Sequence, residues 1–329
     1  MKKILTGIKP TGNGMHMGNY FGALKPLFDM DDGKNDVTVF LPDFHSLTSI
    51  HNGEVLRNNR ERLLKEFFAL MPEKSDITVF EQSKINNLNN IVWILNSVTP
   101  YSMMLRAHSF KDSQNKNSEI NMAVFNYPIL MTADIISYDF DIVPVGKDQK
   151  QHLEFARDIA RNFNKTYNCD IFKLPEAKIN EDLLLIPGTD GRKMSKSYDN
   201  FIGIFDSEKI MKKKIMTIVT GSETLEEPKN PDNCNIFALI KLFASESKQE
   251  EIKQKYLAGN YGYGHAKLEL LEIVLDYFKE AREKYNSFEN NMDYIYEKLE
   301  EGNAKMNKIC DEKYEKILRI TGLKQKTRG

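Results

Sequence analysis

The stretch from residue 4 to residue 20 reads Ile4-Leu5-Thr6-Gly7-Ile8-Lys9-Pro10-Thr11-Gly12-Asn13-Gly14-Met15-His16-Met17-Gly18-Asn19-Tyr20. Its apolar beginning, residues 4–8, predicts a buried strand. Pro10 and the glycines predict a turn, because proline ends a strand and glycine reaches backbone angles that other residues avoid. A helix is then predicted over residues 18–30. The free N–H groups at its start favour an anion, and His16 adds a donor that can reach a phosphate oxygen.

A second stretch, far along the chain, reads Gly191-Arg192-Lys193-Met194-Ser195-Lys196-Ser197. Two ammonium groups in one small loop can neutralise charge that develops on a polyphosphate, and the serines add small donors. Taken alone, each stretch is also explained as a glycine-rich turn or a solvated basic loop. The glycine spacing of the first is neither G-x-G-x-x-G nor G-x-x-x-x-G-K-[ST], so this turn supports neither a dinucleotide fold nor a P-loop. Together the two stretches indicate a clamp on a nucleoside triphosphate.

The chain between the two stretches alternates strands and helices. Residues 36–41 and 76–80 are predicted strands, and residues 53–71 form a strongly amphipathic helix between them. Another strand is predicted to end at Val145, and a last one covers residues 183–186. Residues 85–110 read as helical and residues 111–119 as a mobile polar loop. This order predicts an α/β fold with a doubly wound, Rossmann-like parallel sheet.

Several polar residues fall where such a sheet binds ligands, at the carboxyl ends of its strands. His45 follows the second strand, and Gly146, Asp148 and Gln149 follow the strand that ends at Val145. Asp134 lies inside an apolar helical run, where a carboxylate needs a partner. Each has an equally good structural explanation, as a loop histidine, a helix N-cap or a salt-bridged aspartate.

Beyond Phe205 the pattern becomes all helical. The predicted helices cover residues 207–219, 233–245, 249–257, 265–286, 290–300 and 303–320, and we predict a domain change near residues 200–207. RNA could meet basic and aromatic residues here by charge and stacking, namely residues 212–214, Tyr256, Tyr261, Tyr263 and the tail 324–328. Solvated helix faces and a frayed tail explain any single one of them as well.

Composition sets outer bounds. The 329 residues exceed one average domain, and a 41% hydrophobic share supports a real core. A net charge of −1 excludes a globally basic nucleic-acid binder but not a local basic patch. No apolar run approaches the roughly 18 residues of a membrane span, so we expect no membrane partner. The three widely spaced cysteines suit a reducing cytoplasm and lack the spacing of a zinc or iron–sulfur site.

The two stretches resemble the nucleotide motifs of class I aminoacyl-tRNA synthetases, which are usually written His-Ile-Gly-His and Lys-Met-Ser-Lys-Ser. Residues 193–197 match the second letter for letter, and His16-Met17-Gly18-Asn19 is a variant of the first. Residues 131–135, 143–154 and 157–164 are similar to segments of the bacterial tryptophanyl-tRNA synthetases. The resemblance covers nearly the whole chain. It implies ATP-dependent activation of L-tryptophan with Mg²⁺, transfer to tRNA(Trp), and a homodimer.

The resemblance also implies roles for individual residues. Asp134 would accept the indole N–H, with Met131, Val143 and Val145 around the ring and Tyr127, Gln149 and His45 near the α-amino group. Lys193, Ser195 and Lys196 would be the catalytic residues. ATP would contact Lys9, Pro10, Thr11, His16, Gly18, Asn19, Gly146, Lys147, Asp148, Ile186 and residues 193–197, namely Lys193, Met194, Ser195, Lys196 and Ser197, and no protein side chain would bind metal. Residues 1–204 would be catalytic, with a helical insertion at about 85–140, and residues 205–329 would bind the anticodon.

Two departures and three alternatives accompany this reading. The family usually has glutamine where Lys9 stands, and the turn between Gly12 and Gly18 is one residue longer than usual. A tyrosyl-tRNA synthetase shares the architecture, and a carboxylate such as Asp134 can also accept from a phenol. A non-catalytic paralogue would bind tRNA or nucleotides without activating an amino acid. A nucleotidyltransferase of the same superfamily would not need the helical C-terminal part.

Overall fold

The sheet at the centre of the molecule has five parallel strands in the order β3-β2-β1-β4-β5. The computed structural model describes residues 1–10, 12, 14–115, 120–145, 150–174, 176–179 and 186–324. The strands are β1 (Lys2–Gly7), β2 (Asn35–Leu41), β3 (Thr78–Glu81), β4 (Ile142–Val145) and β5 (Glu176–Ile179). The prediction of a doubly wound parallel sheet is confirmed.

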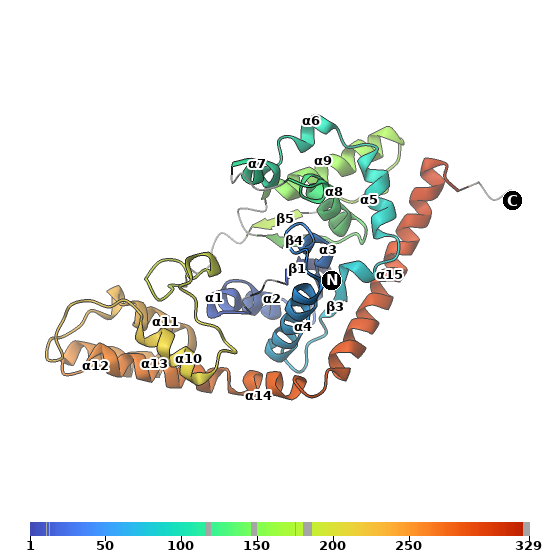
Figure 1. Cartoon of the computed structure of the whole chain (residues 1–329). Coiled ribbons are helices and arrows are strands. Elements are labelled where there is room, and N and C mark those ends of the chain that lie inside the picture. The colour runs from blue at the N-terminus through green and yellow to red at the C-terminus, as the bar shows by residue number, and fades with distance from the viewer. Residues whose placement is uncertain are drawn as a thin grey trace.

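Alternation along the strands divides the interior into two cores, one on each face of the sheet. Ile4 packs into one core and its neighbour Leu5 into the other, and Val79 and Phe80 divide in the same way. Figure 1 shows helices on both faces. One core takes helical residues 17–29, a near-continuous run of α1 (Met17–Asn19), the π-helical turn η1 (Tyr20–Leu24) and α2 (Lys25–Asp29), together with α4 (Gly53–Leu70). The other takes α5 (Leu88–Asn96), α6 (Tyr101–Met104), α8 (Met122–Ile136) and α9 (Lys150–Thr166).

The strand order reverses between β1 and β4, which pair through Ile4 and Ile142. From β1 the chain moves outward through β2 to β3, and it then returns to the other side of β1 for β4 and β5. Open α/β sheets bind ligands outside the carboxyl ends of the strands at such a reversal. The turn after β1 therefore stands at the expected position for a ligand site.

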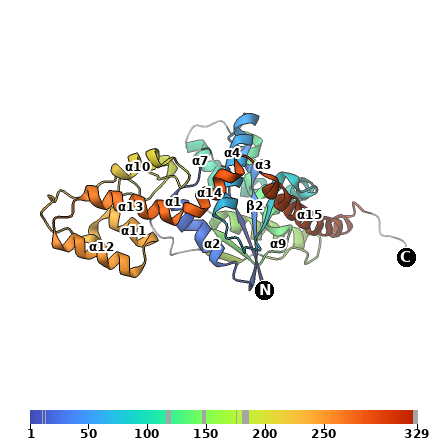
Figure 2. The same cartoon turned by 90° about the horizontal axis from the view of Figure 1, so that it is seen from below.

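The chain after residue 205 is helical among its described residues. Its elements are α10 (Glu208–Met216), the short η5 (Pro231–Asn233), α11 (Asn235–Phe243), α12 (Glu246–Ala258), α13 (Tyr263–Tyr277), α14 (Lys279–Phe288) and α15 (Asp293–Thr321). In Figures 1 and 2 the helices α10–α13 form a lobe on one side of the sheet, and α15 lies at the opposite end of the molecule. No helix in the described ranges combines the length and apolar character needed to cross a membrane.

Helix α15 covers the edge of the sheet at β3. A Cβ atom on Gly302 would lie 1.9 Å from the carbonyl oxygen of Val79, so only glycine permits this approach. Asn303 accepts a hydrogen bond from the amide of Glu81 at 2.9 Å. The helix also supplies Leu299 to one core and Met306 to the other. Edge strands need such protection, because their unpaired backbone groups invite pairing with other chains.

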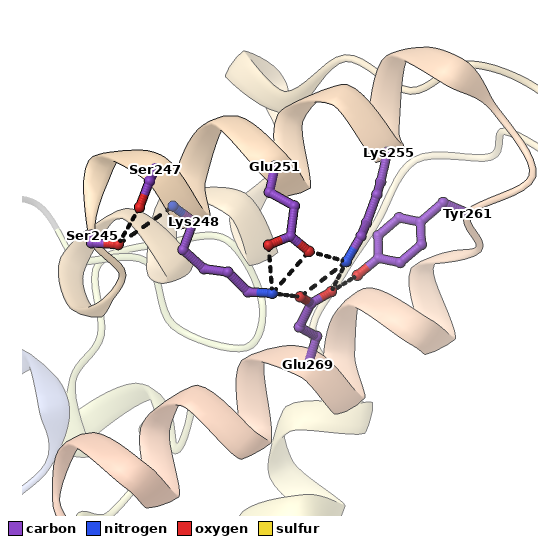
Figure 3. Close-up of polar contacts among 7 residues, drawn as sticks. All are labelled: Ser245, Ser247, Lys248, Glu251, Lys255, Tyr261 and Glu269. Atoms are coloured by element: carbon purple, nitrogen blue, oxygen red, sulfur yellow. Dashed lines mark hydrogen bonds and ion pairs between the residues drawn. The ribbon is translucent and has the colours of Figure 1, made fainter.

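An ion-pair cluster joins α12 to α13 in the lobe. The carboxylate of Glu269 lies 2.8 Å from the ammonium of Lys248 and 3.3 Å from that of Lys255, and it accepts a hydrogen bond from the hydroxyl of Tyr261 (Figure 3). Glu251 bridges the same two lysines from α12. The cluster therefore links α12 to α13 through charged and hydrogen-bonded side chains.

Several expectations about elements were wrong. The polar segment 111–119 is helical as far as residue 115, because α7 (His108–Asn115) extends into it. The predicted helices 290–300 and 303–320 are the single helix α15, since Gly302 lies in its interior against β3. The predicted helix 265–286 is divided into α13 and α14 at Phe278. Strand β5, at residues 176–179, was not predicted.

One further correction concerns a single residue. Tyr256 is fully buried in the lobe and has no face for a nucleic-acid base, because its ring packs against Phe237 and Tyr261. Trp93, on α5, is 78% exposed and so lies at the surface of this chain rather than in its core. Part of what was predicted lies outside the described residues: Thr11, residues 116–119, Gly146, Lys147, Asp148, Gln149, the strand residues 183–185, the tail 325–328 and the side chain of Val145.

Candidate active site

The turn after β1 leads into a capped helix. The Nδ1 atom of His16 accepts a hydrogen bond from the amide of Asn19 at 3.2 Å, and the Asn19 side chain accepts one from the amide of His16 at 3.3 Å. This reciprocal pair fixes the start of α1. Because Nδ1 accepts, the neutral ring carries its proton on Nε2. His16 is thus both the helix cap and a potential donor.

The two motif stretches are joined directly. The amide of Met17 donates to the carbonyl of Ile202, and the amide of Ile204 donates to the carbonyl of Met15, both at 3.1 Å. The sulfur of Met194 lies 3.3 Å from the amide of Gly18. A Cβ atom on Gly18 would lie 3.0 Å from the His16 ring, so a larger residue would crowd this contact. Stretches nearly 180 residues apart in sequence therefore form one structural unit.

The lysine loop is held from within. Asn200 accepts a hydrogen bond from the amide of Ser195 at 2.7 Å and donates one to the carbonyl of Lys193 at 3.1 Å. The amide of Met194 donates to the carbonyl of Ile186 at 2.8 Å, and both side chains are buried. The hydroxyl of Ser195 accepts from the amide of Ser197. These contacts leave Lys193 exposed and Lys196 half-buried.

Two cavities meet at this unit and share Asn19, Ala23 and Lys196. One has a volume of about 610 Å³ and is lined by His16, Gly18, Asn19, Gly22, Ala23, Ile186 and residues 193–198. The other has a volume of about 270 Å³ and is lined by residues 6–9 at the end of β1, Gly14, Met15, Asn19, Ala23, Leu24, Leu27, Lys196, and Arg62, Leu63 and Glu66 of α4. All the described residues expected at ATP line one or the other, except Pro10, which is buried beside them.

The electrostatics of the unit favour an anion. Burial, assisted by the charges of Lys196 and Lys214, lowers the pKa of His16 to about 4. His16 is therefore neutral at physiological pH, as a hydrogen-bond donor rather than a cation. Burial also lowers the pKa of Lys196, with Glu66 opposing the shift and Arg62 adding to it. A bound phosphate group would reduce the repulsion between the positive charges of Lys196 and Arg62.

Asp134, on α8, is only 2% exposed, and two side chains hold its carboxylate. The Nε2 atom of His45 lies 2.9 Å from Oδ2, and the amide of Gln82 donates to both oxygens at 2.8 Å. Burial raises the pKa of Asp134, while the hydrogen bonds of His45 and Gln82 oppose the shift. An ionised carboxylate accepts about four hydrogen bonds, so it can accept a further donor from a ligand.

The surroundings of Asp134 are aromatic and apolar. The ring of Tyr127 lies 4.3 Å from that of His45, centroid to centroid. Met131 stands one helical turn before Asp134 on α8 and is half-buried, and Val143 is buried on β4. The structure thus brings His45, Tyr127 and Asp134 together as expected. Met131 and Val143 line neither of the two cavities described above.

Sequence reasoning missed Gln82, which lies in the short helix η2 (Gln82–Lys84) directly after β3. The edge rule that singled out His45 applies to it equally, since Gln82 follows the carboxyl end of a parallel strand. The predicted strand ends at Phe80, so Gln82 was not placed at the strand's carboxyl end. Arg62 and Glu66 on α4 were missed for a different reason, since on an amphipathic helix they read as solvent-facing charges.

Comparison with known proteins shows which family the chain belongs to. The family model described as tRNA synthetases class I (W and Y) matches residues 1–279. The chain belongs to this family. Within the family, the tryptophan–tRNA ligase of Fusobacterium nucleatum is 48% identical over 323 residues, which are 98% of each chain.

Solved structures of the family agree with this placement. The tryptophanyl-tRNA synthetase of Campylobacter jejuni is 45% identical and has a TM-score of 0.92, covering 98% of this chain and 99% of that one. A second structure of that enzyme, complexed with ADP and tryptophan, also has a TM-score of 0.92 at 44% identity, covering 97% and 99%. The class I synthetase fold with a helical C-terminal region is therefore common to this chain and its relatives.

Proposed function

We propose that this chain is a tryptophan–tRNA ligase, which activates L-tryptophan with ATP and then transfers it to tRNA(Trp). The observation that carries the proposal is the backbone pairing of residues 15–17 with residues 202–204, which holds the Lys-Met-Ser-Lys-Ser loop against the capped helix start. The relatives named above support the choice of amino acid, since they share nearly half of their residues with this chain over its whole length.

In the first step a carboxylate oxygen of tryptophan attacks the α-phosphorus of ATP, which enters as its Mg²⁺ complex. A bond forms between that oxygen and phosphorus as the bond to the bridging oxygen of pyrophosphate breaks. The ammonium groups of Lys193 and Lys196 stabilise the negative charge on the departing pyrophosphate. The protein supplies no covalent nucleophile, so the rate gain comes from positioning and electrostatics.

We assign the two cavities at Asn19 and Lys196 to ATP. The backbone around Gly18, the neutral His16 and the buried Ile186 take the adenosine and phosphates in the larger cavity. Lys9, exposed at the end of β1, contacts a phosphate in the smaller one. By resemblance alone, Gly146 and Asp148 are proposed to face the ribose, Lys147 to contact ATP, and Gln149 to contact the α-amino group.

Selectivity for tryptophan is assigned to Asp134. A bound indole would donate its N–H to the carboxylate that His45 and Gln82 orient, whereas phenylalanine has no donor and would leave one buried acceptor position of that carboxylate unfilled. Such a missing donor costs a competitor on the order of 10⁴–10⁵ in kcat/KM. A separate editing site is unnecessary on this account.

The second step passes the tryptophanyl group to the terminal ribose of tRNA. We propose that the helical part after residue 205 reads the anticodon, with the exposed Lys212 and Lys213 of α10 among its contacts. A homodimer would cover exposed apolar side chains on α5, α6 and α8, namely Trp93, Tyr101 and Met122. We place the reaction in the cytoplasm, in keeping with three cysteines that form no disulfide.

ATP–pyrophosphate exchange with tryptophan, with tyrosine and without amino acid tests the proposal. We expect exchange with tryptophan alone. Exchange with tyrosine instead would keep the nucleotide site and overturn the assignment of Asp134. Exchange with neither would favour a protein that binds tRNA or nucleotides without activating an amino acid. Asp134→Ala should raise the KM for tryptophan far more than the KM for ATP, and equal effects would contradict the pocket.

A further inference from the structure

Helix α4 contacts the turn between β1 and α1 at two points. The carboxylate of Glu66 accepts a hydrogen bond from the amide of Met15 at 2.7 Å. One turn earlier on the same face, the guanidinium of Arg62 donates to the carbonyl of Gly12, also at 2.7 Å. The two contacts lie on either side of Gly14.

Glu66 is an unusual residue for this position on the helix. It is 4% exposed although it carries a carboxylate, and it lies among the apolar residues Leu63 and Phe67 of the same helix. A buried carboxylate costs several kcal/mol unless its oxygens are satisfied. A leucine here would extend the apolar stripe of α4 at no such cost. We therefore take the carboxylate of Glu66 to be functional. Among the described residues, its hydrogen-bond donor is the amide of Met15.

Gly14 fits this arrangement. Its φ of +63° lies in the left-handed region, and a Cβ atom there would lie 2.7 Å from Oε1 of Glu66. The backbone thus turns tightly over the carboxylate. Asn59, a buried residue of α4, lies 3.7 Å from where a Cβ on Gly12 would stand. Helix α4 therefore packs closely against the loop after β1 from Asn59 to Glu66, a length of about two helical turns.

We infer that Glu66 and Arg62 are positioning residues for the nucleotide site: they hold the turn between β1 and α1 on α4, so that His16 and the start of α1 face the bound triphosphate. Both line the smaller cavity together with Lys9 and Lys196. The inference rests on the proposed function for its kinetic readout, but the holding contact itself can be measured without any substrate.

Hydrogen–deuterium exchange on the full-length protein tests the contact first. Glu66→Leu removes the acceptor, and we expect the Met15 amide to exchange about tenfold faster, as for the loss of one buried hydrogen bond. Glu66→Gln keeps an acceptor oxygen and should restore slow exchange. The matched pair Glu61→Leu and Glu61→Gln changes a half-exposed glutamate on the same helix and should leave this amide unchanged.

Kinetics then test the role in positioning. In Glu66→Leu the KM for ATP in pyrophosphate exchange should rise about tenfold, with the KM for tryptophan unchanged and with Glu66→Gln near the wild type. Unaltered amide exchange together with an unaltered KM for ATP would overturn the inference. Faster amide exchange with unaltered KM would reduce Glu66 to a purely structural residue and also overturn it.

The experiments distinguish a failure of the proposed function from a failure of the contact between Glu66 and the turn. If the wild-type protein shows no exchange with any amino acid, the proposed function fails, while the amide measurement still decides the holding contact. If Glu66→Leu fails to fold, Arg62→Met replaces it, because Arg62 is exposed and its loss frees the turn at Gly12. Arg62→Met should also raise the KM for ATP, and an unchanged KM there would count against the inference.

Discussion

The amide nitrogen of Gln82 lies 2.8 Å from both carboxylate oxygens of Asp134, although the two residues belong to different elements on one side of the sheet. Gln82 follows β3 and Asp134 lies on α8. Together with His45 it fixes the carboxylate from two sides. The direction in which Asp134 can accept a ligand is therefore set by residues that need not touch the ligand.

Replacing Gln82 with leucine should weaken tryptophan binding. The carboxylate of Asp134 would lose a donor that opposes the rise of its pKa on burial, and it would be free to rotate. We expect the KM for tryptophan to rise about tenfold and the KM for ATP to stay constant. Asn89→Leu, an exposed change on the neighbouring helix α5, is the control. A KM for tryptophan equal to that of the wild type would show that Gln82 does not orient Asp134.

Lys196 should matter for adenylate formation more than for substrate binding. It is half-buried and lines both cavities, whereas Lys193 is exposed and lines one. We expect Lys196→Met to lower the single-turnover rate about 100-fold, the scale seen when one preorganised charge stabiliser is removed, and Lys193→Met to lower it less. Lys212→Met is a control on the exposed face of α10. An unchanged single-turnover rate in Lys196→Met would exclude the assigned role.

His16 should make stability depend on pH. Burial lowers its pKa to about 4 in the folded state, from an ordinary value of 6.5. Between these values the unfolded chain binds a proton that the folded chain does not, so the free energy of unfolding falls as the pH falls from 6.5 to 4. The full shift corresponds to about 3 kcal/mol. His16→Asn keeps a good N-cap and removes this titration.

The test compares chemical denaturation of the two proteins at several pH values. The wild type should lose about 3 kcal/mol relative to His16→Asn between pH 7 and pH 4. Glu66 acts in the opposite direction, because burial raises its pKa to about 7 and stability is then lost as the pH rises. Both the wild type and His16→Asn contain Glu66, so its contribution cancels in the difference between their free energies of unfolding. Parallel stability curves would show that His16 is not buried in its neutral form.

Glu269 should stabilise the helical lobe in a salt-dependent way. Its side chain is 16% exposed and meets Lys248, Lys255 and Tyr261. Burial alone would raise its pKa, but these hydrogen bonds outweigh burial and lower it, so the stabilisation is present near neutral pH and is lost in acid. After screening by solvent we expect Glu269→Gln to cost about 1 kcal/mol, or roughly 2 °C in Tm.

The exposed Glu272 of the same helix supplies the control, and Glu272→Gln should change Tm by much less. Raising the salt concentration to 1 M should reduce the difference between Glu269→Gln and the wild type, since partly exposed ion pairs are screened. A difference that stays the same as the pH is lowered until the carboxylate of Glu269 is protonated would contradict the ionic origin of the effect.

The sequence by itself determined the alternation of strands and helices, the two nucleotide motifs and the expectation that the carboxylate of Asp134 has a partner. These follow from local rules: the period of apolar residues, the chemistry of turns, and the cost of burying a carboxylate. Strand β5, with the sequence Glu-Ala-Lys-Ile, was missed because it is short and carries two charges. Its place in the sheet comes from pairing with β4 and not from its own pattern.

Only the tertiary structure decided which distant residues act together. Arg62 and Glu66 carry no local signal, since each is an ordinary polar residue of α4 until the fold places it beside Gly12 or Met15. Gln82 stands at a strand end, but only the fold shows that it contacts Asp134. The union of α15 into one helix depends on the approach of Gly302 to β3, and the burial of Tyr256 depends on the packing of the lobe. Contacts between residues far apart in sequence are set by packing, which no window along the chain contains.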